Sequence, residues 1–358
     1  MHAIVANGFA EGPAEALRDY FVARGAEVVT IFHPLTPEHG SRHVITRYGG
    51  GGVIEQREVN LRVRAPASYV LDGLVPLLPP RVETWFGFNP LAATRGLFLR
   101  RLRRARKVVL WSVDFVPDRF GVGTLPTRIY DRIDRHACLH ADAHVELSSA
   151  AREARNRRHG IDVPAHVVPM GAWLARVPRA TFGERRVAFL GHLVERQGVD
   201  LLLDAMRLLP DVQADVVGGG PLEATLRQQA GENVRFHGFV SDHRDVEHLL
   251  AGTALGVAPY RADSFTQYAD PGKLKAYLAA GLPIVLTDVP PNAQELAREA
   301  GAELAPFDAD ALARAIESGL ADRARWQQRH DAALAYVSRF DWEVLLADLV
   351  QKLELRLT

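Results

Sequence analysis

Short apolar segments alternate with amphipathic helical segments along almost the whole chain of 358 residues. Short apolar runs bounded by glycine or proline predict buried strands. Strands that alternate with helices predict parallel sheets with crossover helices. In the first half we expect strands at 3–6, 26–32, 108–113, 143–147 and 165–169. In the second half we expect strands at 187–190, 214–217, 234–236, 255–259 and 282–286. The chain is therefore predicted to have an α/β fold made of two halves.

A hinge is expected between the two halves, because 172–184 shows no clear hydrophobic period. A chain of this length also suits two domains better than one. We predict an N-terminal domain over 1–172, a second domain over 185–338 and a C-terminal helical segment over 339–358. Each of the two domains would carry its own parallel sheet with crossover helices.

The amino-acid composition limits which partners and which cellular compartment are expected. Lysine and arginine together number 43, as do aspartate and glutamate, so no nucleic acid or other polyanion is expected as a partner. Two local runs are basic, 99–107 and 152–159, and we interpret the second as a solvated helix face. A single cysteine, Cys138, excludes an intrachain disulfide and favours a reducing compartment. No signal-peptide pattern or apolar run of membrane-spanning length is visible, so we expect a cytoplasmic protein.

The most specific local pattern of the chain begins at Asp270. Asp270 followed by Pro271 predicts an N-cap and a first helical residue, since proline at that position loses no needed N–H group. Gly281 is then expected to end a helix of about three turns, before a buried strand at 282–286. Free N–H groups at the start of a helix favour a bound diphosphate, and Lys273 in the first turn would add a cation. An ordinary amphipathic helix with a good cap is the alternative.

The same segment resembles the donor-binding helix of GT-B glycosyltransferases, in which Pro-x-Lys-x-x-Glu-Tyr-Leu-Ala-x-Gly-x-Pro recurs. The matching residues are Pro271, Lys273, Tyr277, Leu278, Ala279, Gly281 and Pro283. Ala276 stands where the family usually has glutamate. The resemblance is strongest over 187–290 and implies the GT-B fold, with two Rossmann-like domains, a cleft between them and a C-terminal helix that crosses back to pack on the N-terminal domain. It also implies a nucleoside-diphosphate sugar bound by the second domain, with a UDP-sugar preferred and no cofactor.

A second family pattern, Gly-Arg-Leu-x-x-x-Lys-Gly, corresponds to 191–198, where His192 and Gln197 replace the usual arginine and lysine. Arg196 is the residue that could supply the missing cation. The residues expected to bind the donor are Gly12, Gly191, His192, Arg196, Gln197, Gly219, Tyr260, Asp270, Gly272, Lys273 and Tyr277. The triple glycine 218–220 lacks the spacing of a dinucleotide fingerprint, which argues against a Rossmann dehydrogenase.

Asp114 follows the apolar strand 108–113 and is our candidate for the general base. In open α/β sheets the groups that contact ligands collect at the carboxyl ends of strands, and the position is similar to an aspartate of the bacterial xanthan glucuronosyltransferase. Asp118 is the reserve candidate. Retaining relatives commonly carry two glutamates around the donor helix, where this chain has Tyr268 and Ala276, and this difference favours an inverting reaction. No group of histidine, cysteine and aspartate has metal-ligand spacing, so catalysis is expected to need no metal.

The sequence leaves two classes of acceptor open. The runs 85–88 and 97–107 interleave apolar and basic residues, which would suit an anionic membrane surface and a lipid-linked acceptor. The same residues would equally form a core and a solvated face, with a soluble metabolite as acceptor. We predict a nucleotide-sugar-dependent glycosyltransferase that is cytoplasmic or peripheral at the inner face of the membrane. The alternatives are a GT-B-fold sugar-nucleotide epimerase and a non-catalytic sugar-nucleotide-binding partner subunit, which His192, Gln197 and Ala276 would favour.

Overall fold

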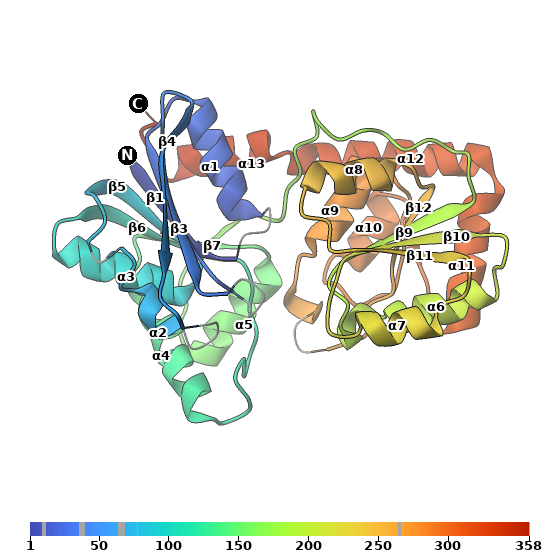
Figure 1. Ribbon diagram of the computed structural model, residues 1–358, viewed down its shortest axis with the longest axis horizontal. Helices are drawn as coiled ribbons and strands as arrows, with labels where there is room; N and C mark the ends of the chain where they lie inside the picture. Colours follow the sequence, from blue (N-terminus) through green and yellow to red (C-terminus); the bar gives the residue numbers. More distant parts are fainter. Residues whose placement is uncertain (9–11, 36–39, 64–68, 77, 264–265, 358) are drawn as a thin grey trace. The chain divides into compact units, whose positions relative to one another are not determined.

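The computed structural model describes residues 1–8, 12–35, 40–63, 69–76, 78–263 and 266–357 (Figure 1). The chain divides into two compact units, an N-terminal unit of residues 1–169 with 346–358 and a C-terminal unit of residues 170–345. The second boundary falls inside helix α13 (Trp342–Lys352). The two ends of the chain meet within the N-terminal unit, where Nε2 of His2 lies 2.9 Å from the carbonyl oxygen of Arg356.

The N-terminal unit is built on a mixed sheet with the strand order β4-β3-β2-β1-β5-β6-β7-β8. Its strands are β1 (His2–Asn7), β2 (Val28–His33), β3 (Arg42–Gly49), β4 (Gly52–Asn60), β5 (Val82–Gly87), β6 (Ala105–Ser112), β7 (Ala143–Glu146) and β8 (His166–Val167). Its helices are α1 (Pro13–Ala23), α2 (Tyr69–Asp72), α3 (Pro90–Arg101), α4 (Leu125–His140) and α5 (Ser149–His159). Neighbouring strands from β2 through β1 and β5 to β8 run parallel, whereas β3 runs antiparallel to β2 and β4.

The apolar pattern predicted neither the β3–β4 hairpin nor the central strand β5 of this sheet. Strand β4, with the sequence GVIEQREVN, is exposed along almost its whole length. It is held by its backbone ladder to β3, and the turn between them uses Gly50 and Gly51 at φ values of 60° and 83°. Hydrophobic periodicity finds strands that face a core, and β4 is an edge strand without one.

The C-terminal unit is a fully parallel sheet with the order β11-β10-β9-β12-β13-β14. Its strands are β9 (Arg186–Leu190), β10 (Gln213–Val217), β11 (Val234–Gly238), β12 (Leu255–Ala258), β13 (Ile284–Leu286) and β14 (Glu303–Leu304). Its helices are α6 (Val199–Arg207), α7 (Glu223–Gln229), α8 (His243–Ala251), α9 (Gly272–Ala279), α10 (Ala293–Glu299), α11 (Ala309–Ala321) and α12 (Arg323–Val337). In Figure 1, α8 and α12 lie above the strands and α6 and α7 below them, so helices cover both faces. The five strands predicted for this half are confirmed within two residues at each end.

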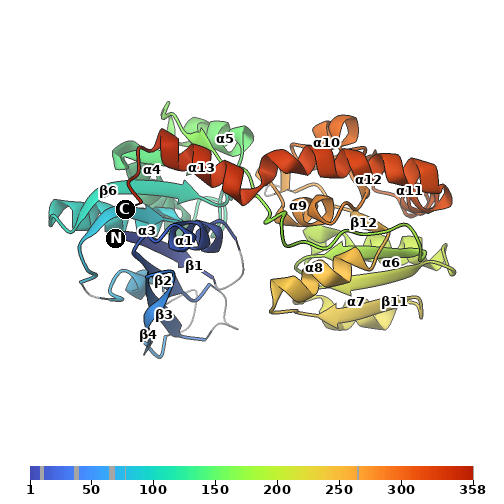
Figure 2. The same cartoon turned by 90° about the horizontal axis from the view of Figure 1, so that it is seen from above.

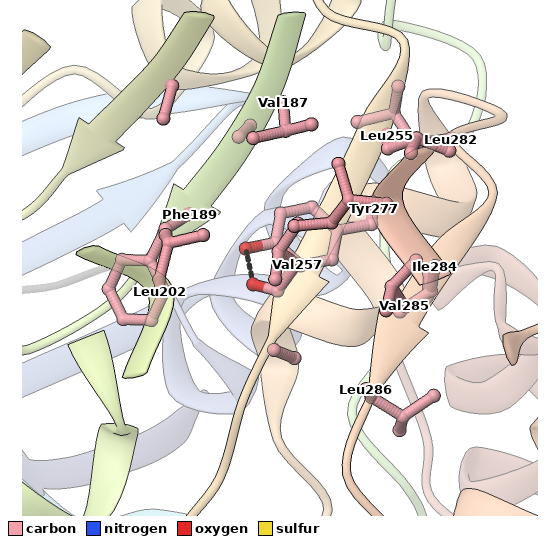
Figure 3. Close-up of a cluster of buried hydrophobic side chains, with 14 of the residues drawn as sticks. Val187, Phe189, Leu202, Leu255, Val257, Tyr277, Leu282, Ile284, Val285 and Leu286 are labelled. Carbon is pink, nitrogen blue, oxygen red and sulfur yellow. Dashed lines mark hydrogen bonds between the residues drawn. The ribbon is translucent and has the colours of Figure 1, made fainter. Parts of the chain in front are cut away.

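One buried tyrosine fixes helix α9 against the middle of this sheet. The hydroxyl of Tyr277 accepts a hydrogen bond from the backbone N–H of Leu190 at 2.7 Å and donates to the carbonyl of Val257 at 3.2 Å (Figure 3). The neighbouring strand makes room for the ring at Gly256, where a Cβ atom would lie 2.6 Å from it. Because both hydrogen-bonding functions of its hydroxyl are used by β9 and β12, Tyr277 orients helix α9 from within the core.

Candidate functional site

Glycines bring three loops at the carboxyl ends of β9, β10 and β12 into backbone contact. A Cβ atom on Gly218 would lie 2.0 Å from the carbonyl oxygen of Gly191, and one on Gly198 would lie 1.8 Å from that of Pro259. The backbone N–H of Leu193 donates to the carbonyl of Gly219 at 2.9 Å. Side chains at Gly218 and Gly198 would force these loops apart, so the local backbone depends on glycine there.

Lys273 lies against these loops in the first turn of α9. Its Nζ donates to Oε1 of Gln197 at 2.6 Å and lies 4.2 and 4.4 Å from the ring centroids of Phe189 and Tyr260. The same Nζ is 3.4 Å from the place where a Cβ of Gly191 would be. The structure therefore brings together four of the residues that the sequence assigned to donor binding.

The ammonium group of Lys273 is buried, and no carboxylate in the described part of the chain forms an ion pair with it. Burial lowers the pKa of Lys273 well below the ordinary value for lysine. A buried cation held only by a neutral amide and two aromatic rings is poorly compensated. A phosphate anion at this place would supply the missing negative charge.

The start of α9 differs from its sequence prediction. Its N-cap residue is Pro271, without a side-chain cap, and the helix has 8 residues, which is shorter than the expected three turns. The carboxylate of Asp270 instead accepts hydrogen bonds from Nζ of Lys275 at 2.8 Å and from the backbone N–H of Met170 at 2.7 Å. The predicted Asp270 cap is wrong, because the buried Lys275 ammonium takes this carboxylate as its counter-charge. The first-turn N–H groups are thus left without a side-chain acceptor.

The remaining predicted donor residues of this unit differ in burial. His192 is exposed, and Arg196 is half-buried in the 3-10 turn Glu195–Gln197. Tyr260 is 2% exposed, and its hydroxyl has no hydrogen-bond partner among the residues that the structure describes. Gly272 adjoins Met170, whose Cε would be 3.0 Å from a Cβ on that glycine.

The N-terminal unit has a separate pocket of about 250 Å³ at the carboxyl ends of β1, β5 and β6. Its lining includes Asn7, Gly12, Tyr69, Asn89, Asp114 and Arg119. The predicted base Asp114 and the predicted glycine Gly12 thus lie in one pocket. Nη2 of Arg119 lies 2.5 Å from Oδ1 of Asp114, so the Asp114 carboxylate that lines the pocket is ion-paired with Arg119. The reserve candidate Asp118 pairs with Arg158 at 2.8 Å and is not part of the lining.

A buried arginine that the sequence analysis missed holds the loop of Asp114. Arg155 is 2% exposed, although its basic run was interpreted as a solvated face. Its Nη2 donates to the carbonyl of Asp114 at 2.9 Å, and its Nε donates to Glu146 at 2.6 Å. It also contacts Asp134 and Ser112. The basic run 152–159 gave no hint of this, since the carboxylates that bind Arg155 come from other elements.

The proposed membrane-facing run is largely core. Its apolar members Trp85, Phe86, Phe88, Leu97 and Leu99 are buried, mostly in β5 and α3, whereas Phe98 and Leu102 are exposed. Several of its basic members make contacts within the unit, for example Arg100 with Asp142 and Arg106 with Glu83. The alternative interpretation of this run, a core with a polar face, therefore holds for these residues. No helix in the described part of the chain combines the length and apolar character needed to cross a bilayer.

We predict that Arg155→Met destabilises the protein by about 3–5 kcal/mol, because it leaves the buried carboxylates of Glu146 and Asp134 without their cation. Urea unfolding measures the loss. Arg152→Met on the same helix is the matched control, since Arg152 is 36% exposed and lies 4.0 Å from its acidic neighbour. The control should change stability by less than about 0.5 kcal/mol. Equal losses in the two variants would show that Arg155 has no special positioning role.

Comparison with known proteins gives matches in sequence and in fold. Residues 184–322 match the family model described as glycosyl transferases group 1. The phosphatidyl-myo-inositol mannosyltransferase of Mycolicibacterium smegmatis is 32% identical over 182 residues, which cover 48% of this chain and 45% of that protein. A GDP-mannose-dependent alpha-(1-6)-phosphatidylinositol dimannoside mannosyltransferase of Mycobacterium tuberculosis is 27% identical over 256 residues, covering 66% of this chain and 65% of that protein. The matches thus span about half to two thirds of these relatives.

Solved structures agree with the fold. Sucrose-phosphate synthase of Thermosynechococcus elongatus superposes with a TM-score of 0.74 over 99% of this chain and 98% of its own, at 17% identity. HepE of Anabaena in complex with UDP-glucose superposes with a TM-score of 0.63 over 76% of this chain and 78% of its own, at 18% identity. The chain has the GT-B fold, and its residues 184–322 are similar to the glycosyl transferases group 1 family.

Proposed function

We propose that this protein is a glycosyltransferase that moves a sugar from a nucleoside-diphosphate sugar to an acceptor. The observation that carries the proposal is the buried Lys273 ammonium, which has no carboxylate partner among the described residues and lies beside glycine loops and an uncapped helix start. Backbone N–H groups, a partial positive helix charge and a lysine are together the chemistry that holds a diphosphate. The sequence relatives and the UDP-glucose complex of a structural neighbour support this class of donor.

The nucleotide of the donor has two candidates, UDP and GDP. One sequence relative is named GDP-mannose-dependent, whereas the HepE structure contains UDP-glucose. A UDP-sugar is our proposal from the resemblance of the donor segment, and a GDP-sugar is its competitor. Because Gln197 stands where the family pattern has a lysine, the diphosphate would contact one lysine rather than two. Lys273 should therefore account for most of the charge-dependent affinity.

We predict that Lys273→Met weakens donor binding by about tenfold or more, because it removes the cation and keeps the unbranched side chain. Calorimetric titration with UDP-, GDP- and dTDP-sugars, with and without EDTA, measures the affinity and any need for metal. The same substitution should stabilise the protein without donor, since it removes a buried charge. That gain should be full at pH values below the folded-state pKa of Lys273 and shrink as the pH rises from there towards 10.5, the ordinary lysine pKa, because the wild-type penalty vanishes once lysine is neutral in both states.

Arg261→Met is the control for this titration, because Arg261 is an exposed cation of the same unit that pairs with Asp200. It should change the donor affinity less than about twofold. If all the sugar nucleotides bind Lys273→Met as tightly as they bind the wild type, the donor site is not at α9.

For the chemical step we propose inversion without a metal, with Asp114 as the base that takes the acceptor proton. Asp114 is the carboxylate of the N-terminal pocket at the end of β6, and its backbone is held by Arg155. We predict that Asp114→Asn lowers kcat by about 100-fold or more, the usual contribution of a general base, and leaves the calorimetric donor affinity unchanged. Asp118→Asn is the matched control and should keep most of the activity.

The anomeric configuration of the product, followed by NMR, tests the stereochemistry separately. An inverted product that forms in EDTA agrees with the proposal, and a retained configuration would remove the need for a base at Asp114. The names of the sequence relatives favour a lipid-linked acceptor, with a soluble metabolite as the other class. Donor turnover without any acceptor would identify an epimerase, and donor binding without nucleotide release would identify a non-catalytic partner subunit.

A further inference from the structure

Three side chains of the N-terminal unit meet outside both sites described above. His33 ends β2, His43 lies at the start of β3, and Asp72 ends α2. The two strands lie side by side in Figure 2 and pair through Phe32 and Val44. Nδ1 of His33 lies 2.8 Å from Nδ1 of His43, and Oδ1 of Asp72 lies 3.8 and 3.7 Å from these two nitrogens. We call these three residues the His–His–Asp cluster.

The cluster is buried and incompletely bonded. His33, His43 and Asp72 are 2%, 0% and 7% exposed. Oδ1 of Asp72 and Nε2 of His43 have no hydrogen-bond partner among the described residues. A hydrogen bond between the two Nδ1 atoms uses one proton and leaves the carboxylate oxygen that faces them without a bond. Buried polar atoms are usually paired, so these two exceptions call for an explanation.

The distances fit a shared ion. Ligand atoms about 2.0–2.1 Å from a tetrahedral Zn²⁺ lie about 3.3 Å from one another, which falls between the shortest and longest separations in the cluster. Two imidazole nitrogens and a carboxylate are ligand types that zinc commonly takes.

A second layer of contacts orients the carboxylate. Oδ2 of Asp72 accepts a hydrogen bond from Nδ2 of Asn7 at 2.8 Å, and Oδ1 of Asn7 accepts one from Asn89 at 2.7 Å. Outer contacts of this kind fix the ligands of metal sites. Asn7 and Asn89 both line the pocket of Asp114, so the cluster is linked to that pocket by two hydrogen bonds.

We propose that His33, His43 and Asp72 bind a divalent zinc ion that joins β2, β3 and α2. The ion satisfies the unpartnered oxygen of Asp72 and places Asn7 at the pocket wall. It is a structural ion, and the chemical step does not pass through it. The sequence analysis predicted no metal because the three ligands lie far apart along the chain, without a short spacing that would reveal them.

The test is the metal content and zinc affinity of the full-length protein. Protein purified without chelator should contain about one zinc per chain, and the metal-free protein should regain it on titration with zinc. Asp72→Asn and His43→Ala should each weaken zinc binding by about tenfold or more. His2→Gln is the matched control, since His2 is a buried histidine of the same sheet that bonds to a backbone carbonyl.

Two readouts remain if a variant fails to fold. Adding EDTA to the wild type should lower its unfolding temperature, and zinc should restore it. Replacing zinc by Co²⁺ in the wild type should give a visible absorption band that His43→Ala lacks. The proposal would be overturned if the folded wild-type protein binds zinc no more tightly than His43→Ala does and keeps its unfolding temperature in EDTA. Donor binding at Lys273 belongs to the other unit, so neither outcome decides the glycosyltransferase proposal.

Discussion

The C-terminal unit buries the Lys273 ammonium without an ion-pair partner among the described residues, and the account of its loops rests on this feature. Glycines let the loops after β9, β10 and β12 approach at backbone distance, and Tyr277 holds α9 so that Lys273 lies beside them. Gln197 offers the ammonium one neutral acceptor. A fold that buries a lysine in this way is less stable than it would be with an apolar side chain there, unless an anion binds.

In the N-terminal unit, buried polar contacts hold two sides of one pocket. On one side Arg155 crosslinks β7 and α4 to the loop of Asp114. On the other side the His–His–Asp cluster is joined through Asn7 to Asn89, which caps α3. Both sets are built from charged or titratable groups that would be costly to bury singly. Their common effect is to fix the carboxyl ends of β1, β5 and β6, where ligands of α/β sheets bind.

The sequence was most informative where apolar periodicity and glycine spacing act locally. The parallel strands of the C-terminal unit were predictable for that reason, whereas the grouping of Lys273 with the loop 191–198 was expected from the resemblance to GT-B glycosyltransferases. The cap expected at Asp270 failed because the buried charge of Lys275, a tertiary feature, takes the same carboxylate. Arg155 and the His–His–Asp cluster were not predictable, since their partners are brought together only by the fold. The edge hairpin β3–β4 was missed because it has little apolar face.

The central claim is that the Lys273 ammonium is the charge that meets the donor diphosphate. Its pKa can be followed by NMR of protein labelled with ¹⁵N-lysine, assigned with Lys273→Met, in the absence and presence of a saturating sugar nucleotide. The account predicts a pKa below the ordinary lysine value in the free protein and a clear rise when the donor binds, because the phosphates stabilise the charged form. An ordinary pKa that does not respond to bound donor would contradict it.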